Sequence, residues 1–228
     1  MRRVLLALAA LALAAPMATA QVGQNEQKRI DNAAAVLRDM TDIPQDIWQK
    51  ANCVGVIPSV KKAAFVFGGE YGKGVVSCRT ANGWSAPAFF ELERGSWGLQ
   101  AGGEMIDFVF LVMNQTGIEH LLQDKFTLGG AGSVAAGPVG RNATAATDLQ
   151  MHAEILSYSR SQGLFAGINL NGGVLKPDKD ANTDMYGPNV TSRQILVAGT
   201  VKPPATARPF MTALVQANNE SQGQPAIK

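Results

Sequence analysis

The chain has 228 residues, of which 46% are hydrophobic and 17% are charged, and its formal net charge is +2. Because globular domains typically carry about 25% charged residues, this composition excludes a highly charged, disordered chain. The 24 glycines follow no three-residue period, which excludes collagen, and they favour a β-rich fold with many turns.

The N-terminus has the three-part pattern of a secretory signal peptide. A short basic start is followed by an apolar run over residues 4–15 and by the cleavage-site motif Ala18-Thr19-Ala20. The apolar run is too short for a membrane-spanning helix, which needs about 20 residues. We therefore expect cleavage after Ala20 and a periplasmic or secreted protein. Without residues 1–20 the basic and acidic residues are equal in number, so nucleic acid is not an expected partner.

An exported chain folds in an oxidising compartment, where its only two cysteines, Cys53 and Cys78, favour a disulfide. Such a bridge would close a loop of about 25 residues and stabilise the fold by roughly 3 kcal/mol. Two buried free thiols are the alternative. The cysteines form no CxxC pair, so a structural zinc site is not expected.

Two helices are predicted before the β-rich part of the chain. After a flexible segment at 21–27, apolar residues recur at helical spacing between Lys28 and Met40 and predict an amphipathic helix. Asp42 is placed to cap a second, short helix that runs toward Ala51. The polar face of the first helix mixes both charges, which favours packing on its own domain over lying on a membrane surface.

Strand patterns dominate the next sixty residues. Strands are expected over residues 54–57, 63–67, 74–78, 88–92, 98–102 and 108–113. The turns expected between them are Pro58-Ser59, Gly68-Gly69, Asn82-Gly83 and Arg94-Gly95-Ser96. Asn82-Gly83 suits a tight hairpin, because both residues tolerate positive φ angles.

The second half of the chain begins with a short helix over 117–122 and has strand character over 155–170. Residues 176–189 are polar and predict a loop or a single helical turn, and residues 201–228 predict a flexible tail. No internal repeat divides the chain. We therefore predict one α+β domain over 28–200, with a mostly antiparallel sheet, sandwich- or barrel-like, and short N-terminal helices packed on it.

No catalytic motif is complete. The glycine-rich segment 68–74 lacks the spacing of a phosphate loop, and His120 and His152 belong to no metal or triad motif. As an alternative, the carboxylate pairs Glu91/Glu93 and Glu104/Asp107 could form the site of a hydrolase. Carboxylates at alternate positions of a solvent-exposed strand give the same sequence pattern. We therefore expect no enzyme, no cofactor and no bound metal.

Ordered glycine-rich and aromatic motifs recur along residues 28–198. They are Ile57–Lys62, Phe67–Val75, Trp84–Phe89, Gly98–Glu104, Asp107–Val109, Leu128–Gly130, Ala135–Arg141, Ser157–Gly167, Asn182 and Tyr186-Gly187. The most specific combination is Gly-Pro-x-Gly-Arg followed by Ser-Tyr-Ser-x-x-x-Gly-Leu-Phe-Ala-Gly. In these motifs the chain resembles the SYLF domain family, and with its N-terminal pattern it is similar to an exported bacterial branch of that family.

The resemblance implies a lipid-binding module without known catalysis. Intracellular members of the family bind phosphoinositide-containing membranes and are linked to actin patches. For an exported chain actin is not an expected partner, and we expect an anionic phospholipid surface instead. A structural or protein-interaction module of the cell envelope, without lipid affinity, is the alternative.

Basic side chains are the candidates for contact with lipid headgroups. They are Lys61, Lys62 and Lys73 near the first turns, together with Lys28 and Arg29 on the first helix. Since the net charge without residues 1–20 is near zero, any attraction to lipid must be local. Arg141 and Arg160 lie inside the family motifs, and each is expected to contact phosphate or to pair with Glu104 or Asp107.

Overall fold

The computed structural model describes residues 23–41, 43–64, 67–97, 105–129, 133–139, 152–161 and 164–221. The predicted signal peptide therefore lies outside the described residues. The same holds for Asp42, for the strand expected over 98–102, for Glu104 and for Arg141.

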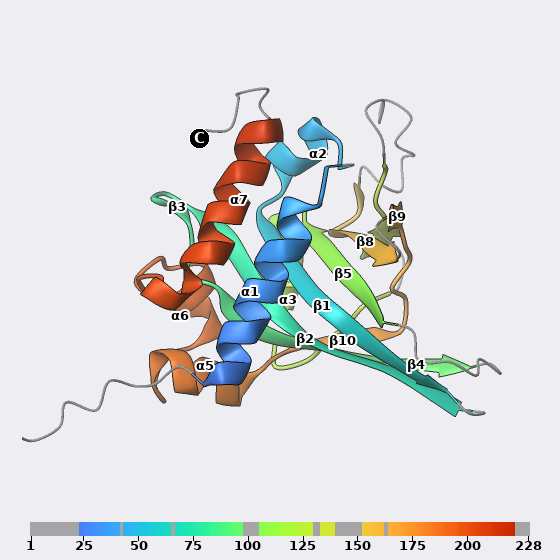
Figure 1. Ribbon diagram of the computed structural model, residues 1–228, viewed down its shortest axis with the longest axis horizontal. Coiled ribbons are helices and arrows are strands. Elements are labelled where there is room, and N and C mark those ends of the chain that lie inside the picture. Colours follow the sequence, from blue (N-terminus) through green and yellow to red (C-terminus); the bar gives the residue numbers. More distant parts are fainter. Residues whose placement is uncertain are drawn as a thin grey trace, which may run out of the picture.

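One ten-stranded sheet forms the centre of the described structure, in the order β6-β10-β4-β2-β1-β5-β8-β7, with β3 paired to β2 and β9 to β8 (Figure 1). The strands are β1 Cys53–Ala64, β2 Phe67–Thr80, β3 Gly83–Trp84, β4 Ala88–Trp97, β5 Met105–Val112, β6 Phe126–Thr127, β7 Val134–Ala136, β8 Ile155–Ser161, β9 Leu164–Gly167 and β10 Gly173–Pro177. All neighbours are antiparallel except β7 and β8. The α+β class and the mostly antiparallel sheet are confirmed.

Helices cover both faces of this sheet. They are α1 Gln24–Arg38, α2 Gln45–Lys50, α3 Gln115–Leu121, α5 Lys179–Tyr186, α6 Ser192–Leu196, the 3-10 helix η2 Ala205–Ala207 and α7 Arg208–Ser221. We call the side packed against α1, α2 and α7 the α1 face, and the side packed against α3 and α6 the α3 face. Figure 1 looks onto the α1 face, with α1 and α7 side by side.

Alternation along the strands builds the two cores. In β1, Val54 and Val56 pack under α1, whereas Cys53 and Ile57 point to the α3 face. Successive side chains of a strand point to opposite faces, so a strand that is apolar at every position is buried on both sides. This two-sided burial explains why the sequence shows unbroken apolar runs here.

The turn expected at Pro58-Ser59 is wrong. β1 continues through these residues as a bulge, and Ser59 adopts a left-handed conformation with φ 52°. Its backbone N–H donates to Asp107 on β5, 2.8 Å away. A bulge adds one residue to one strand, so the side-chain alternation shifts beyond it. As a result Lys61, paired with Tyr71 on β2, lies on the α1 face.

Two further expected turns are wrong, and one is confirmed. Gly68-Gly69 lies within β2, and Arg94-Gly95-Ser96 lies within β4, where the two segments pair with each other. Glycines do not mark a turn where their backbone pairs with a neighbouring strand. Asn82-Gly83 does form the tight turn between β2 and β3, and Gly83 has φ 104°.

The expected flexible tail is also wrong in part. Residues 208–221 form α7, which packs beside α1 and buries Phe210, Ala213 and Leu214. These residues recur at helical spacing, so one apolar stripe is covered although the rest of the helix is polar. At the other end of the domain, α1 begins at Gln24, within the segment expected to be flexible.

The segment expected to be a loop or one turn contains the eight-residue helix α5. Asp178 caps it, because its side chain accepts a hydrogen bond from the backbone N–H of Ala181. An aspartate directly before a helical segment is a recognised N-cap signal. The same aspartate is central to the polar site described next.

Candidate functional site

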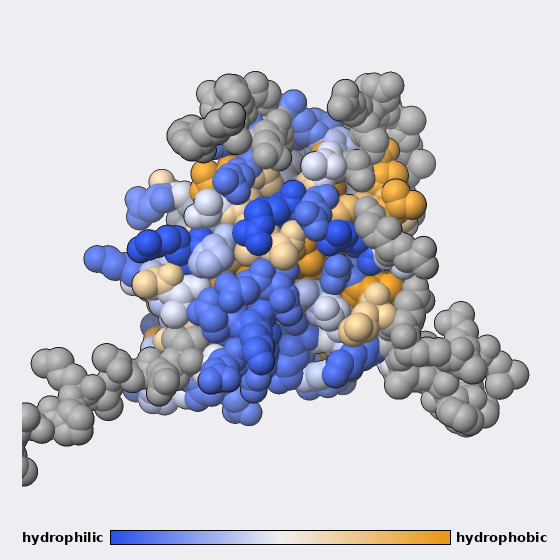
Figure 2. Space-filling view, viewed as in Figure 1, coloured by the Kyte–Doolittle hydropathy of each residue, from blue (hydrophilic) through white to orange (hydrophobic). Residues whose placement is uncertain are grey.

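A cluster of five charged side chains lies on the α1 face, where the N-terminal half of α1 meets β2, β4 and β10. We call it the Asp178 cluster, and its members are Arg29, Lys73, Glu91, Lys176 and Asp178. Asp178 Oδ2 lies 2.6 Å from Arg29 Nη1 and 2.9 Å from Lys73 Nζ. Figure 2 shows that hydrophilic residues cover this part of the surface, over α1 and α5.

The strand register brings these residues together. Lys73 pairs with Glu91 across β2 and β4, and Glu91 pairs with Lys176 across β4 and β10. Cross-strand partners share a face, so the three side chains form one row. Lys73 Nζ lies 2.5 Å from a Glu91 oxygen, and Lys176 Nζ lies 3.2 Å from the other. The Tyr71 hydroxyl, from the next row, donates to Glu91 over 2.9 Å.

The cluster keeps its carboxyl groups ionised. Burial alone would raise the pKa of Glu91, but hydrogen bonds from Lys73, Tyr71 and Lys176 outweigh it and hold that pKa below its ordinary value. The pKa of Asp178 is lowered in the same way, because Lys73, Arg29 and the Ala181 N–H outweigh the effect of burial. Burial opposes the charge of Lys73 too, yet its bonds to Glu91 and Asp178 raise its pKa.

This arrangement argues against the two-carboxylate hydrolase. Such an enzyme needs one carboxyl group that stays protonated to donate a proton. Glu91 is held ionised, and Glu93 pairs with Lys176 at 2.7 Å. Asp107, from the second pair considered, pairs with Arg160 at 3.7 Å and accepts from Ser59. The described residues also contain no group of His, Cys, Asp and Glu side chains placed to hold a metal ion.

The structure separates the five predicted headgroup ligands. Arg29 and Lys73 belong to the Asp178 cluster, so a phosphate would have to compete with Asp178 for both. Lys28 is exposed on the outer side of α1. Lys61 is exposed on β1, and within the described part of the chain it has no ion-pair partner. The backbone of Lys62 pairs with Glu70 on β2, and its side chain lies outside the described residues.

Arg160 takes the ion-pair alternative that the sequence left open. It lies 2.8 Å from Asp39, which follows α1, and 3.7 Å from Asp107 on β5. Its guanidinium also lies over the ring of Phe165, 5.7 Å from the centroid. Arg160 therefore joins the end of α1 to the sheet.

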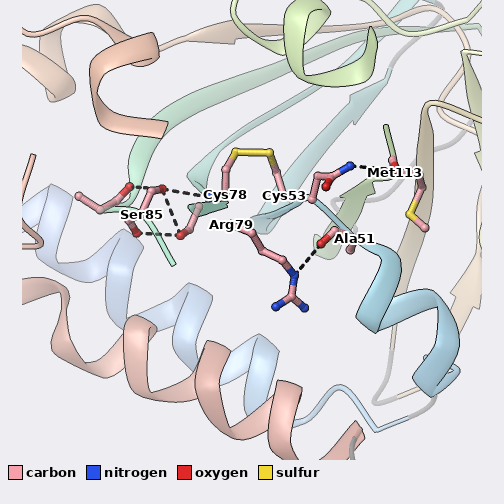
Figure 3. Close-up of a disulfide and its surroundings, with 9 residues drawn as sticks. Ala51, Cys53, Cys78, Arg79, Ser85 and Met113 are labelled. Atoms are coloured by element: carbon pink, nitrogen blue, oxygen red, sulfur yellow. Dashed lines mark hydrogen bonds between the residues drawn. A yellow bond between two sulfur atoms is a disulfide. The ribbon is translucent and has the colours of Figure 1, made fainter. Parts of the chain in front are cut away.

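The Cys53–Cys78 disulfide is present, with the two cysteines directly opposite each other on β1 and β2 (Figure 3). Beside it, Arg79 donates to the carbonyl oxygens of Ala51 and Trp48 and to the side chain of Asn218. Arg79 also lies over the ring of Trp84, 4.4 Å from its centroid. These contacts tie α2 and α7 to this end of the sheet.

Sequence reasoning missed Asp178 and Lys176. Both fall in a segment read as a loop, and their partners are far away in the chain: Arg29 is 149 residues from Asp178. The sequence offered one signal for this site, Asp178 itself, because an aspartate directly before a helix is a common N-cap.

Among the described residues, no helix combines the length and the apolar character needed to cross a membrane.

Comparison with known proteins gives consistent matches. Residues 93–217 match the sequence model of the Ysc84 family, described as "Las17-binding protein actin regulator". The chain is 37% identical over 176 residues to "Protein YSC84" of Saccharomyces cerevisiae, and 36% identical over 176 residues to "LAS seventeen-binding protein 3" of the same yeast. It is 33% identical over 198 residues to "SH3 domain-containing YSC84-like protein 1" of Mus musculus.

These matches cover most of this chain but only part of each relative. They span 75% of the chain for both yeast proteins and 82% for the mouse protein. They span 37% of YSC84, 38% of LAS seventeen-binding protein 3 and 58% of the mouse protein. The shared part is therefore one region of longer relatives.

Proposed function

The chain belongs to the Ysc84 family, the family of the SYLF domain, and from this premise we propose that it is an exported, non-catalytic module that binds the headgroups of anionic phospholipids. The observation that carries the proposal is the exposed side chain of Lys61. Within the described residues it has no carboxylate partner, whereas Lys73 on the neighbouring strand has two. An unpaired cation on a rigid strand is available to a phosphate group.

Two observations support the binding role over catalysis. One relative is named for binding, and the family is described as a binding protein and actin regulator. The carboxyl groups considered for hydrolysis, those of Glu91 and Glu93, form ion pairs with lysine side chains. The surplus of positive charge is local, because the chain without its first twenty residues has as many acidic as basic residues.

Export is supported by the N-terminal pattern and by the Cys53–Cys78 disulfide, since such bridges persist in oxidising compartments. The test is to produce the whole chain in a bacterium with a periplasm and to weigh the purified protein by mass spectrometry. A mass that begins at Gln21, in the periplasmic fraction, supports export. An intact N-terminus in the cytoplasm would contradict it.

Sedimentation with vesicles tests the lipid role. The purified protein should co-sediment with vesicles that contain phosphatidylglycerol and remain in solution with pure phosphatidylcholine. Raising the salt from 50 to 500 mM should release it, since headgroup attraction is screened within a Debye length of roughly 4–5 Å at the higher salt. No sedimentation with any vesicle would end the lipid proposal.

A protein-binding role in the cell envelope is the second candidate. The family is described as Las17-binding, and one relative is named "LAS seventeen-binding protein 3". The outer side of α1 presents Lys28, Asp31 and Arg38, a mixed set of charges typical of a protein interface. If no vesicle binds the protein, crosslinking in intact envelopes followed by mass spectrometry is the next test. A crosslink from α1 to one reproducible partner would support this second candidate.

A further inference from the structure

Four solvent-accessible side chains form a row across the sheet, next to the Asp178 cluster. They are Met105 on β5, Lys61 on β1, Tyr71 on β2 and Glu93 on β4, and each is the ladder partner of the next. Cross-strand partners share a face, so all four side chains lie on the α1 face. Neighbouring strands lie about 4.8 Å apart, so the row spans roughly 14 Å. We call it the open row.

The open row remains accessible to solvent beside α1. The neighbouring row of Lys73 and Glu91 is tied to α1, because Asp178 joins Lys73 to Arg29. In the open row, by contrast, Met105 is 68% exposed, Tyr71 is 42% exposed and the side chain of Glu93 is 47% exposed. Figure 1 shows β1, β2 and β4 continuing past α1 toward the lower right. A ligand can therefore reach this row from the α1 face.

Tyr71 gives the open row an anchored aromatic ring. Its hydroxyl donates to Glu91 over 2.9 Å, and Glu91 is itself held by Lys73 and Lys176. In the part of the chain that the structure describes, no other Phe, Tyr or Trp side chain is as exposed. A ring that is already fixed loses little freedom when a ligand binds to it. Because the face of an aromatic ring is electron-rich, it attracts a cation.

The charges on the two sides of Tyr71 have opposite sign, and both can accept a ligand. Lys61 is exposed and has no ion-pair partner among the described residues. Glu93 uses its Oε1 atom for Lys176, 2.7 Å away, and its second carboxylate oxygen has no partner in the described ranges. An ammonium group over the Tyr71 ring could donate to that second oxygen while a phosphate accepts from Lys61.

The order of side chains along the open row matches the order of groups in one class of phospholipid. From β5 to β4 the row is apolar, cationic, aromatic and anionic. A phospholipid with a primary amine has its apolar part first, then a phosphate, two carbon atoms and an ammonium group. The trimethylammonium group of phosphatidylcholine has no N–H to donate to a carboxylate, and the headgroup of phosphatidylglycerol has no cation for the ring.

We infer that the open row binds the phosphoethanolamine headgroup of a phospholipid, with the phosphate at Lys61, the ammonium group between the Tyr71 ring and Glu93, and the glycerol part beside Met105. This inference rests on the proposed lipid binding and adds the headgroup that is recognised. Anionic lipids supply the general attraction to the surface. Beyond Met105 the sheet continues to β8 and β9, where Figure 2 shows hydrophobic residues, and the acyl chains leave on that side.

Vesicles of equal surface charge test the headgroup preference. Both types contain the same fraction of phosphatidylglycerol, and the remaining lipid is either phosphatidylethanolamine or phosphatidylcholine. The protein should bind the phosphatidylethanolamine vesicles about threefold more tightly. Glu93→Gln and Tyr71→Leu should each abolish this preference. Lys176→Gln is the matched control, because it removes the partner of Glu93 but leaves the carboxylate in place, and it should keep the preference. Thermal unfolding shows that each variant is folded.

The outcomes separate this inference from the proposed function. Equal binding to both vesicle types would overturn the inference and leave lipid binding standing. A preference that persists in Glu93→Gln and Tyr71→Leu would also overturn it, because lipid packing rather than the open row would then be the cause. If the protein binds neither vesicle type, the proposed function and the inference both fail.

Soluble phosphoethanolamine distinguishes the lipid from its free headgroup. Added at the concentration of the accessible phosphatidylethanolamine, it should leave vesicle binding unchanged, because it lacks the glycerol and acyl groups that lie beside Met105. Release of the protein from the vesicles would show that the free headgroup is the ligand and would overturn the assignment to a lipid.

Discussion

Lys61 and Lys73 lie on neighbouring strands and on the same face of the sheet, yet their surroundings differ. Lys73 contacts Glu91 and Asp178 and helps to hold α1 against β2. Lys61 is exposed on β1, where no described carboxylate pairs with it. The comparison teaches that a basic residue indicates a ligand site only when the fold leaves it without an internal partner.

The two regions therefore have different roles in this account. The Asp178 cluster joins segments that are distant in the chain, so its loss should affect stability. Lys61 is exposed and has no ion-pair partner among the described residues, so its substitution should affect binding. Each prediction below changes one property and leaves the other.

The largest effect on stability is expected from the disulfide. Replacing both Cys53 and Cys78 with alanine should lower the free energy of unfolding by about 3 kcal/mol, because the unfolded chain is no longer constrained by the 25-residue link. Urea unfolding measures this change. Vesicle binding should persist under native conditions, since the bridge lies at the start of β1, away from Lys61. An unchanged unfolding midpoint would contradict the prediction.

Asp178→Asn should cost about 2–3 kcal/mol. Asparagine keeps the N-cap of α5, but Arg29 and Lys73 lose the buried charge that pairs with both. This free-energy cost is smaller than that of breaking a fully buried ion pair, because Lys73 is partly exposed to solvent. Asp180→Asn, at an exposed position of the same helix, is the control and should change the unfolding free energy by less than about 0.5 kcal/mol.

The cluster also predicts sensitivity to acid. The pKa values of Glu91 and Asp178 are lower in the folded than in the unfolded protein. The unfolded chain therefore takes up protons first, and stability is complete above the ordinary values of 4.5 and 3.8 and is lost as the pH falls through the lower, folded values. Urea unfolding between pH 7 and pH 3 should show this loss.

The double variant Glu91→Gln, Asp178→Asn is the matched test of that acid sensitivity. It should be less stable than the natural protein at pH 7 and should lose less free energy of unfolding on acidification. A double variant with the same pH dependence as the natural protein would show that other carboxylates cause the loss.

The smallest effect concerns the bulge that places Lys61 on the α1 face. Ser59→Gly should raise the free energy of unfolding by about 0.5 kcal/mol, because glycine accepts the left-handed backbone without strain while the unfolded chain gains some freedom. Thermal unfolding measures the change. Vesicle binding should be unaltered. A clear loss of stability would mean that the serine side chain has a contact that this account omits.

Local signals predicted the parts of the structure that depend on neighbours in sequence. The apolar spacing of α1 and the Asn82-Gly83 turn are of this kind. The pairing of Cys53 with Cys78 was predictable because the chain has only two cysteines. Pro58-Ser59 looked like a turn because its local composition is that of one. The strand continues there because β5 pairs alongside and Asp107 accepts the Ser59 N–H, which no local pattern reveals.

The candidate site was predictable only in part for the same reason. The sequence identified five basic residues. Which of them form internal ion pairs depends on Asp178, which is 105 residues from Lys73 in the chain. The segment of helix α7 was predicted to be a flexible tail because its composition is polar. Its apolar stripe is buried only because α1 packs beside it. Long-range packing decides both cases.

The central claim is tested most directly by matched neutralisation of three lysines. Binding to phosphatidylglycerol vesicles is measured for Lys61→Gln, Lys73→Gln and Lys28→Gln, after thermal unfolding has shown that each is folded at the assay temperature. Loss of one lysine near the headgroups costs about 1 kcal/mol, so Lys61→Gln should bind about fivefold more weakly. Lys73→Gln and Lys28→Gln should bind within about twofold of the natural protein. Unchanged binding of Lys61→Gln, together with a loss for either of the others, would contradict the account.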